Sequence, residues 1–357
     1  MATTDLPAKL TELGAKCGAN WPTMIAAANA TPEERAKLAE RIIDGHLLPA
    51  DTAAVVFGSL ARGEWTPGSD RDWALLVDGQ VDAAHADVAR KLKTAVEADS
   101  KAPGPTGVFG SFVFSHDVVH FIGGNDDTNT NTTRRILLLL ESHSLTDDLV
   151  RERVLRALLA RYIGEDLLYH EPHRFHVPRF LLNDYVRYWR TMGVDSAQKR
   201  RDRVDKWALR NVKLRLSRKL IFVAGLWACL SCHLHPSAEL RESRTRGDRD
   251  ALPSDMATFL LQFSQQPPLA TLADAFGKYE AWEAAKTSFD AYENFLSILN
   301  DNEQREHLEK LKVEDATSDE LFQRAKKAAS NFQCGLSKLF LETNLELTRA
   351  TQTYGVF

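Results

Sequence analysis

Short apolar runs in the first third of the chain predict a small β-sheet. Runs of four to eight apolar residues bounded by glycine, proline or aspartate are typical of buried strands. We predict strands at Val55–Phe57, at Asp70–Val77, which opens with Asp-Arg-Asp, and at Val108–Phe114. Between the last two, residues 83–99 carry apolar side chains at helical spacing. The sheet region is therefore expected over about residues 51–124.

Apolar residues that recur every three or four positions predict helices on both sides of this sheet. Residues 1–50 follow this pattern, and from Thr132 onward the chain is predicted to be almost entirely helical. A basic and apolar run at residues 205–230 carries the clearest buried stripe: Leu209, Val212, Leu216, Leu220 and Val223.

Two segments give more specific expectations within the helical regions. Thr31, Pro32 and Glu34 have the types expected for an N-cap, a first-turn proline and an acidic first turn, so a helix is predicted to start there. Residues 237–254 are polar and are predicted to form a loop.

These patterns predict an α+β fold with a small mixed sheet and a large C-terminal helical domain. We expect an N-terminal helical segment over residues 1–50 and a sheet-bearing domain over residues 51–170. Residues 171–357 are expected to form the helical domain, which ends in a flexible tail.

Composition adds limits but no function. The 357 residues are 44% hydrophobic and 26% charged, which allows two or three domains with their own cores. The net charge of -4 gives no global reason for tight nucleic-acid binding, so any basic surface must be local. The chain shows no charged-then-apolar leader and no apolar stretch of the ~20 residues that a membrane span needs. We therefore expect a cytoplasmic protein without a membrane segment.

The four cysteines, at positions 17, 229, 232 and 334, are too scattered for a secreted disulfide framework. Cys229 and Cys232 have C-x-x-C spacing but lie in an apolar helical run. Buried thiols are the main expectation for this pair, and a zinc or redox role is the alternative.

The first two predicted strands carry the densest candidate chemistry. Asp70 and Asp72 are one residue apart, so on a strand their side chains point to the same face. Such a pair can hold a hard divalent cation, and the small Gly58-Ser59 turn before it lets phosphates approach the backbone. The alternative is a surface turn followed by a solvated acidic strand.

The order of strand, Gly58-Ser59 and then Asp70-x-Asp72 resembles the signature of the DNA polymerase beta-like nucleotidyltransferase superfamily. The longer run, with Ala-Arg-Gly-Glu after Gly-Ser, resembles the uridylyltransferase of bacterial nitrogen regulation and its relatives. The resemblance implies transfer of a nucleoside monophosphate from an NTP or dNTP to a hydroxyl, with release of pyrophosphate. It also implies Mg²⁺ or Mn²⁺ held by the two aspartates, and Gly58 and Ser59 at the β- and γ-phosphates.

The same resemblance implies a third carboxylate, which enzymes of this kind often carry on the third strand. The predicted strand at Val108–Phe114 carries none. The nearest acids are Asp117, in a possible short helix after Ser115, and Asp127, in a Gly-rich loop. Either is a candidate third metal ligand.

Three basic residues are candidates for nucleotide binding. Arg62 can reach a phosphate from the turn after Gly58-Ser59, or it can pair with Glu64. A nucleotidyltransferase also needs cations opposite the metal site, and Arg210 and Lys213 on the predicted helix of residues 205–230 are the candidates. The alternative for these two is a solvated helix face.

The acceptor hydroxyl is left open by the sequence. Tyr354 lies near the C-terminus after a long predicted helix, and it is either part of a frayed end or a self-modified residue. Size, domain order and tail resemble the Hailong-type antiphage nucleotidyltransferases, which build a DNA oligomer on a C-terminal tyrosine. Other acceptors that the superfamily implies are a single-stranded oligonucleotide, an effector protein and tRNA. A nucleotide-binding module without catalysis is the alternative of a different class, and the sequence does not indicate an oligomeric state.

Overall fold

The structure, a computed structural model, describes residues 5–44, 48–98, 107–202 and 206–356. Its sheet has four strands in the order β3-β2-β1-β4. The strands are β1 (Thr52–Phe57), β2 (Trp73–Val77), β3 (Ser111–Phe114) and β4 (Ser142–Ser144). β1 pairs antiparallel with β2 and β4, and β2 pairs parallel with β3, so the sheet is mixed. Together with the helices this confirms the predicted α+β class.

The strand boundaries differ from the predicted ones in three places. β1 starts three residues earlier than predicted, at Thr52, and β3 starts only at Ser111. β2 starts at Trp73, so Asp70, Arg71 and Asp72 form the extended segment that leads into it. β4 was not predicted, because its sequence, Ser-His-Ser, has no apolar alternation.

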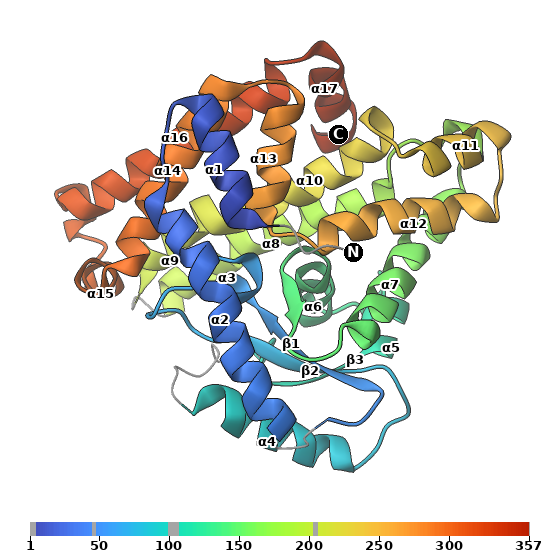
Figure 1. The fold of residues 1–357 in the computed structure, drawn as a ribbon, viewed down its shortest axis with the longest axis horizontal. Coiled ribbons are helices and arrows are strands. Elements are labelled where there is room, and N and C mark those ends of the chain that lie inside the picture. The colour runs from blue at the N-terminus through green and yellow to red at the C-terminus, as the bar shows by residue number, and fades with distance from the viewer. Residues whose placement is uncertain (1–4, 45–47, 99–106, 203–205, 357) are drawn as a thin grey trace.

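Helices make up most of the described chain (Figure 1). Those before and within the sheet region are α1 (Leu6–Cys17), α2 (Pro22–Asp44), α3 (Gly58–Arg62), α4 (Ala84–Glu97), α5 (Ser115–His120), α6 (Asn129–Leu140) and α7 (Leu149–Leu167). Those that follow are η1 (Pro172–Arg174), α8 (Arg179–Asp202), α9 (Trp207–Lys213), η2 (Leu214–Arg218), α10 (Lys219–Leu234), α11 (Ala238–Arg246), α12 (Ala251–Ser264), α13 (Pro268–Lys278), α14 (Trp282–Asn300), α15 (Asn302–Lys310), η3 (Asp315–Thr317), α16 (Glu320–Leu341), α17 (Leu345–Ala350) and η4 (Thr351–Val356). Asp99 and Asp205, at the limits of two predicted helical runs, lie outside the described residues.

Both faces of the central strands are buried, because their side chains alternate between two cores. On one face Val56 and Leu75 pack with Leu38 of α2 and Leu92 of α4. On the other face Val55 joins a larger core formed mainly by helices. Figure 1 shows α2 running across the front of the sheet and α4 below it.

The larger core holds the helical part of the chain against the sheet. It contains buried side chains from α1 through α17, so the first and the last helices share it. α14 and α16 pack along each other, and α1 packs on α13 and α14. The domain boundaries predicted at residues 50 and 170 stay predictions.

Two local predictions were wrong. No helix starts at Thr31, because α2 runs through Pro32, and the Thr31 hydroxyl donates to the carbonyl of Ala27, 2.7 Å away. Residues 237–254 are not a loop but contain α11 and the start of α12. Ser237 caps α11, and Gly247 ends it in the left-handed conformation, so turn-type residues here separate two helices.

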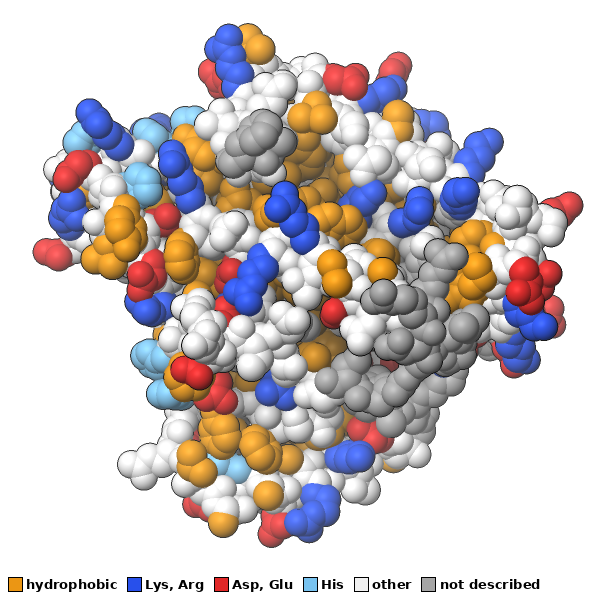
Figure 2. All heavy atoms as spheres, turned by 180° about the vertical axis from the view of Figure 1, so that it is seen from behind, with side chains coloured by type: hydrophobic (Ala, Val, Ile, Leu, Met, Phe, Trp, Pro, Cys, Tyr) orange, Lys and Arg blue, Asp and Glu red, His pale blue; other side chains and the backbone are white. Residues whose placement is uncertain are grey.

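Among the described residues, no single helix has the length and apolar composition to cross a membrane. One bent pair, Trp207–Leu234 with Ala238–Arg246, meets that test only when taken together. On the face shown in Figure 2, Lys and Arg side chains are dispersed among acidic, polar and apolar ones. This dispersion fits the small net charge of -4.

Candidate active site

Asp70 and Asp72 lie on the same side of the segment that leads into β2. The backbone N–H of Phe57 donates to the carbonyl of Asp72, 2.9 Å away, which extends the ladder between β1 and β2. Arg71 points the other way, pairing with Glu34 and donating to the carbonyl of Val96. The period of two predicted for this stretch therefore holds.

Gly58 turns the chain from β1 into α3 beside these carboxylates. Its φ is +67°, a conformation that residues with a side chain rarely adopt. A Cβ atom at this position would lie 3.2 Å from Oδ2 of Asp72. Glycine is thus needed here both for the backbone conformation and for the close approach of Asp72.

We expect the Gly58→Ala substitution to reduce any activity of this site at least about 10-fold and to destabilise the protein by about 1 kcal/mol. Gly18→Ala is the matched control, because Gly18 has φ +59° but nothing within 4 Å of an added Cβ. Thermal unfolding and activity are measured for both variants. Equal losses of activity in the two would contradict a specific role for the contact between Gly58 and Asp72.

Helices from the C-terminal half close the pocket above the two aspartates. Its lining comes from the sheet side through Gly58, Ser59, Arg62, Glu64, Ser69, Asp70 and Asp72, and from the helices through Lys213, Ser217, Arg218, Leu296, Leu299 and Arg305. The cavity volume is ≈ 50 Å³. Sites for whole nucleotides are several times larger, about 300 Å³ or more. This arrangement leaves room for small groups only.

The wide turn η2 sets the spacing of the basic residues. It is a π-helical turn between α9 and α10, with Lys213 just before it and Arg218 at its end. A turn with more residues than an α-helical one brings positions five apart closer to one face. Lys213, Ser217 and Arg218 consequently all line the same pocket.

Opposite charges face one another across this pocket. Burial raises the pKa of Asp72 to about 6, and Glu141 and Asp70 add to the rise while Arg218 and Lys213 oppose it. Burial likewise lowers the pKa of Lys213 to about 8, helped by Arg305 and Arg218 and opposed by Asp70 and Asp72. A cation bound beside the carboxylates would favour their charged form and so oppose the effect of burial.

A buried ionic network supports the floor of the pocket. Arg62 pairs with Glu64, at 2.9 Å, and with Glu141. Arg218 pairs with the other carboxylate oxygen of Glu141, at 2.7 Å, and the Tyr292 hydroxyl donates to Glu64, at 3.0 Å. Arg62 therefore pairs with Glu64, one of its two predicted roles, while it still lines the pocket.

Glu141 is a residue that sequence reasoning missed. It lies between the apolar run at the end of α6 and β4, and its side chain is fully buried. Its charge acts on Asp72 across the sheet. The signal that marks it is a single acid directly after Ile136–Leu140, where an unpaired charge would be costly.

Replacing Tyr292 with phenylalanine tests whether this network positions the pocket. The lost hydrogen bond to the buried Glu64 carboxylate is expected to cost about 2 kcal/mol of stability. Without this hydrogen bond, Glu64 is no longer a fixed neighbour of Arg62 and Glu141. We therefore expect activity to fall about 10-fold. Tyr185→Phe, at another buried tyrosine, is the control, and denaturant unfolding and activity are measured for both. Unchanged activity in Tyr292→Phe would show that the network serves stability only.

The two candidate third ligands do not line this pocket. Asp127 lies in a separate buried cluster, where it accepts hydrogen bonds from Arg135, Arg187 and the N–H of Gly123. Burial raises its pKa, but these bonds outweigh burial and lower it to about 2. Asp117 lies on α5, about half exposed, 3.6 Å from the ring of His116. The metal roles of both stay untested predictions.

Two other predicted residues also lie elsewhere. Arg210 is on α9 but is not part of the pocket lining, whereas Lys213 is. Tyr354 lies in η4, where the Arg179 guanidinium stacks over its ring at 5.2 Å from the centroid. It lines a different cavity with Asn183 and Arg190.

The cysteine pair is buried and its thiols are free. Both Cys229 and Cys232 are fully covered in α10, and burial raises the pKa of each thiol. Within the described part of the chain, no group of three or more His, Cys, Asp or Glu side chains is arranged to hold a metal ion by itself.

Comparison with known protein families matches one region of the chain, residues 37–150. No curated protein and no solved structure matches the chain. The matched region contains Gly58, Ser59, Asp70, Asp72 and Glu141, whereas Lys213, Arg218 and Arg305 lie outside it. The match supports the likeness of this region to the polymerase beta-like superfamily. Residues 37–150 match the family model of the nucleotidyltransferase domain, and this part of the chain is similar to domains that transfer nucleoside monophosphates.

Proposed function

We propose that the protein is a metal-dependent nucleotidyltransferase. It transfers a nucleoside monophosphate from an NTP or dNTP to a hydroxyl and releases pyrophosphate. The observation that carries this proposal is the placement of Asp70 and Asp72 on one side of the segment that leads into β2, next to Gly58 and opposite basic side chains from the helices. In the reaction the acceptor oxygen bonds to the α-phosphorus, and the bond from that phosphorus to the bridging oxygen of the β-phosphate breaks.

Asp70 and Asp72 suit Mg²⁺ or Mn²⁺. Mg²⁺ in nucleotide enzymes is usually held by one or two carboxylates, with phosphate and water as the other ligands. The two carboxylates supply anionic oxygen ligands, and the charge of Glu141 adds to the negative potential at Asp72. When bound, the ion would stabilise the charge that develops on the phosphates and the leaving pyrophosphate.

Lys213, Arg218 and Arg305 are proposed to bind the triphosphate. Arg305 is 5% exposed, and its Nε, although 3.5 Å from Glu309, makes no hydrogen bond among the described residues. A buried donor without a partner is costly, and a phosphate oxygen would satisfy it. A pocket of this volume holds only small groups. The helices that carry Lys213, Arg218 and Arg305 are therefore proposed to move away from the sheet when the nucleotide enters.

Arg305→Ala is expected to raise the KM for the nucleotide at least about 10-fold, the effect of losing one charged phosphate contact. Arg324→Ala is the control, because Arg324 is an exposed arginine on the neighbouring helix α16. Steady-state kinetics with varied nucleotide separate the two. An unchanged KM in Arg305→Ala would remove Arg305 from the binding site.

For the acceptor, the proposal keeps the Tyr354 hydroxyl, with an oligonucleotide built on it in antiphage defence. Because its ring packs under Arg179 and lines a different cavity, the proposal includes a movement of η4 that brings the hydroxyl to Asp72. An effector protein, as in the nitrogen-regulation uridylyltransferase, or tRNA is the alternative acceptor.

One incubation experiment tests both the transfer reaction and the role of Tyr354 as acceptor. The protein is mixed with each labelled NTP and dNTP in Mg²⁺ or Mn²⁺ and analysed by mass spectrometry, with an Asp70→Ala, Asp72→Ala double variant beside it. Pyrophosphate release that the double variant lacks supports transfer, and added nucleotides on the C-terminal peptide support Tyr354. Transfer that persists in the double variant would overturn the assignment of the aspartates. Transfer without a modified C-terminal peptide would overturn only the acceptor.

A further inference from the structure

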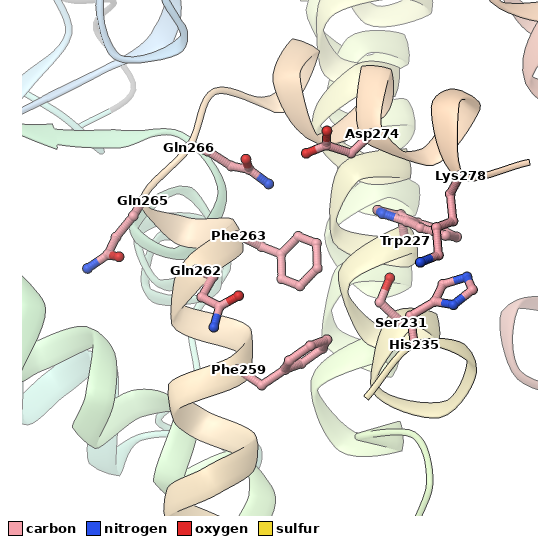
Figure 3. Close-up of a pocket in the computed structure, with 10 residues that line it drawn as sticks. All are labelled: Trp227, Ser231, His235, Phe259, Gln262, Phe263, Gln265, Gln266, Asp274 and Lys278. Atoms are coloured by element: carbon pink, nitrogen blue, oxygen red, sulfur yellow. The ribbon is translucent and has the colours of Figure 1, made fainter. Parts of the chain in front are cut away.

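Another cavity lies between α10, α12 and α13 (Figure 3). It shares no lining residue with the pocket around Asp70 and Asp72. Its volume is ≈ 420 Å³, within the range of small-molecule sites. Neither the nucleotidyltransferase match nor the proposed reaction uses it, because all of its lining residues lie after residue 226.

Aromatic side chains form two opposing walls of this cavity. In Figure 3, Phe259 and Phe263 project from α12 toward Trp227 and Ser231 on α10. The two phenylalanine rings meet edge to face, with centroids 5.6 Å apart. Trp227 is buried and held by an edge contact with Tyr279 at 5.9 Å. These fixed rings favour a flat, unsaturated ligand between them.

The cavity also contains polar groups that the protein leaves unpaired. Ser231 is 2% exposed, and its hydroxyl makes no hydrogen bond among the described residues. Figure 3 shows this hydroxyl directed into the space between α12 and α13. A buried hydroxyl without a hydrogen-bond partner raises the free energy of the folded protein. A ligand atom that formed this hydrogen bond would remove the penalty, and this would favour binding.

The amide side chains at the edge of the cavity indicate which hydrogen-bonding groups a ligand needs. Gln262 and Gln266 each provide a donor and an acceptor, the combination that pairs with the edge of a nucleobase. At the rim Asp274 pairs with Lys9 at 2.7 Å, and Lys278 lies one helical turn further along α13. The lining therefore combines aromatic and amide side chains with two charged residues of opposite sign at the rim.

We propose that this cavity binds the nucleobase of a nucleoside, at a site separate from nucleotidyl transfer. The base stacks against Phe263 and Trp227, and its polar edge bonds to Ser231 and the glutamines. An aliphatic ligand would leave Ser231 unpaired, and a strongly charged one would meet both signs of charge at the rim.

Calorimetric titration of the full chain with adenosine, guanosine, cytidine and uridine in EDTA tests this site. Nucleosides lack phosphate, so they are expected to bind only weakly to the pocket at Asp70 and Asp72. At least one is expected to bind with a Kd below about 1 mM. Phe263→Ala should weaken binding at least about 10-fold, as expected for the loss of one stacking ring. Ser231→Ala should weaken it too while leaving the Tm equal or higher, because the variant loses an unpaired buried hydroxyl.

Gln265→Ala is the matched control. Figure 3 shows that the Gln265 amide points away from the cavity, and it lies 3.5 Å from Glu152. The affinity of the Gln265→Ala variant for the nucleoside should equal that of the unmodified protein. The proposal is overturned if no nucleoside binds, or if binding survives Phe263→Ala and is lost in Asp72→Ala. A Ser231→Ala variant that binds normally would also overturn it. None of these outcomes depends on whether the protein transfers nucleotides.

Discussion

Replacing Asp72 with asparagine is expected to abolish nucleotidyl transfer and also to stabilise the metal-free protein. Loss of a carboxylate that holds the metal should reduce transfer at least about 1,000-fold, which is about 4 kcal/mol of barrier. The gain in stability arises because the folded protein raises the pKa of Asp72 from 3.8 to about 6. At pH 8 the charged carboxylate therefore opposes folding by up to about 3 kcal/mol.

The pH dependence of this gain follows from the direction of the shift. A carboxyl with a raised pKa favours folding while it is protonated, and that contribution is lost as the pH rises through the folded pKa. The difference in Tm between Asp72→Asn and the unmodified protein should be full above about pH 6 and vanish near pH 4. Thermal unfolding in EDTA from pH 4 to 8 measures it, with the exposed Asp87→Asn as control. A lower Tm in Asp72→Asn at pH 8, or transfer at the normal rate, would refute the prediction.

Asp127→Ala is expected to have the second large effect, on stability. The substitution leaves the guanidinium of Arg135, which is fully buried, with Asp184 as its one remaining ionic partner among the described residues. Removing one partner of such a buried cluster costs about 3–5 kcal/mol. Because the folded protein lowers the Asp127 pKa to about 2, its contribution is present above pH 4 and is lost as the pH falls toward 2. Denaturant unfolding at pH 7 and pH 3 measures this.

The same variant separates a structural role from a metal role. If Asp127 is structural, transfer per folded molecule and the dependence on Mg²⁺ should stay unchanged at a temperature where the variant is folded. Asp117→Ala, at the exposed alternative, should change neither stability nor transfer. A raised Mg²⁺ requirement in Asp127→Ala without loss of stability would restore Asp127 as a metal ligand.

The part of the site that depends on local geometry could be predicted from the sequence. A period of two placed Asp70 and Asp72 on one side, and Arg71 does point to the other. The positive φ of Gly58 fits the expectation of a small turn at the phosphates. Lys213, predicted as a cation opposite the metal site, does line the pocket. In each case the deciding contacts lie within a few residues of each other along the chain.

The parts that were missed depend on contacts between distant segments. Arg218 shares the pocket only because η2 is wider than an α-helical turn, and i, i+4 spacing cannot show that. Glu141 stands before a three-residue strand that is recognisable only once it pairs with β1. Arg305 comes from α15, and its place opposite Lys213 depends on how the last helices pack.

The bond from Tyr292 to Glu64 has a consequence for the chain during its synthesis. The ribosome releases the segment with Asp70 and Asp72 long before the residues that support and complete its pocket, which come from α14 and α15. A nascent chain that has folded only its N-terminal part lacks both the support of Tyr292 and the charge of Arg305. Incomplete translation products would thus carry the aspartates without the complete pocket.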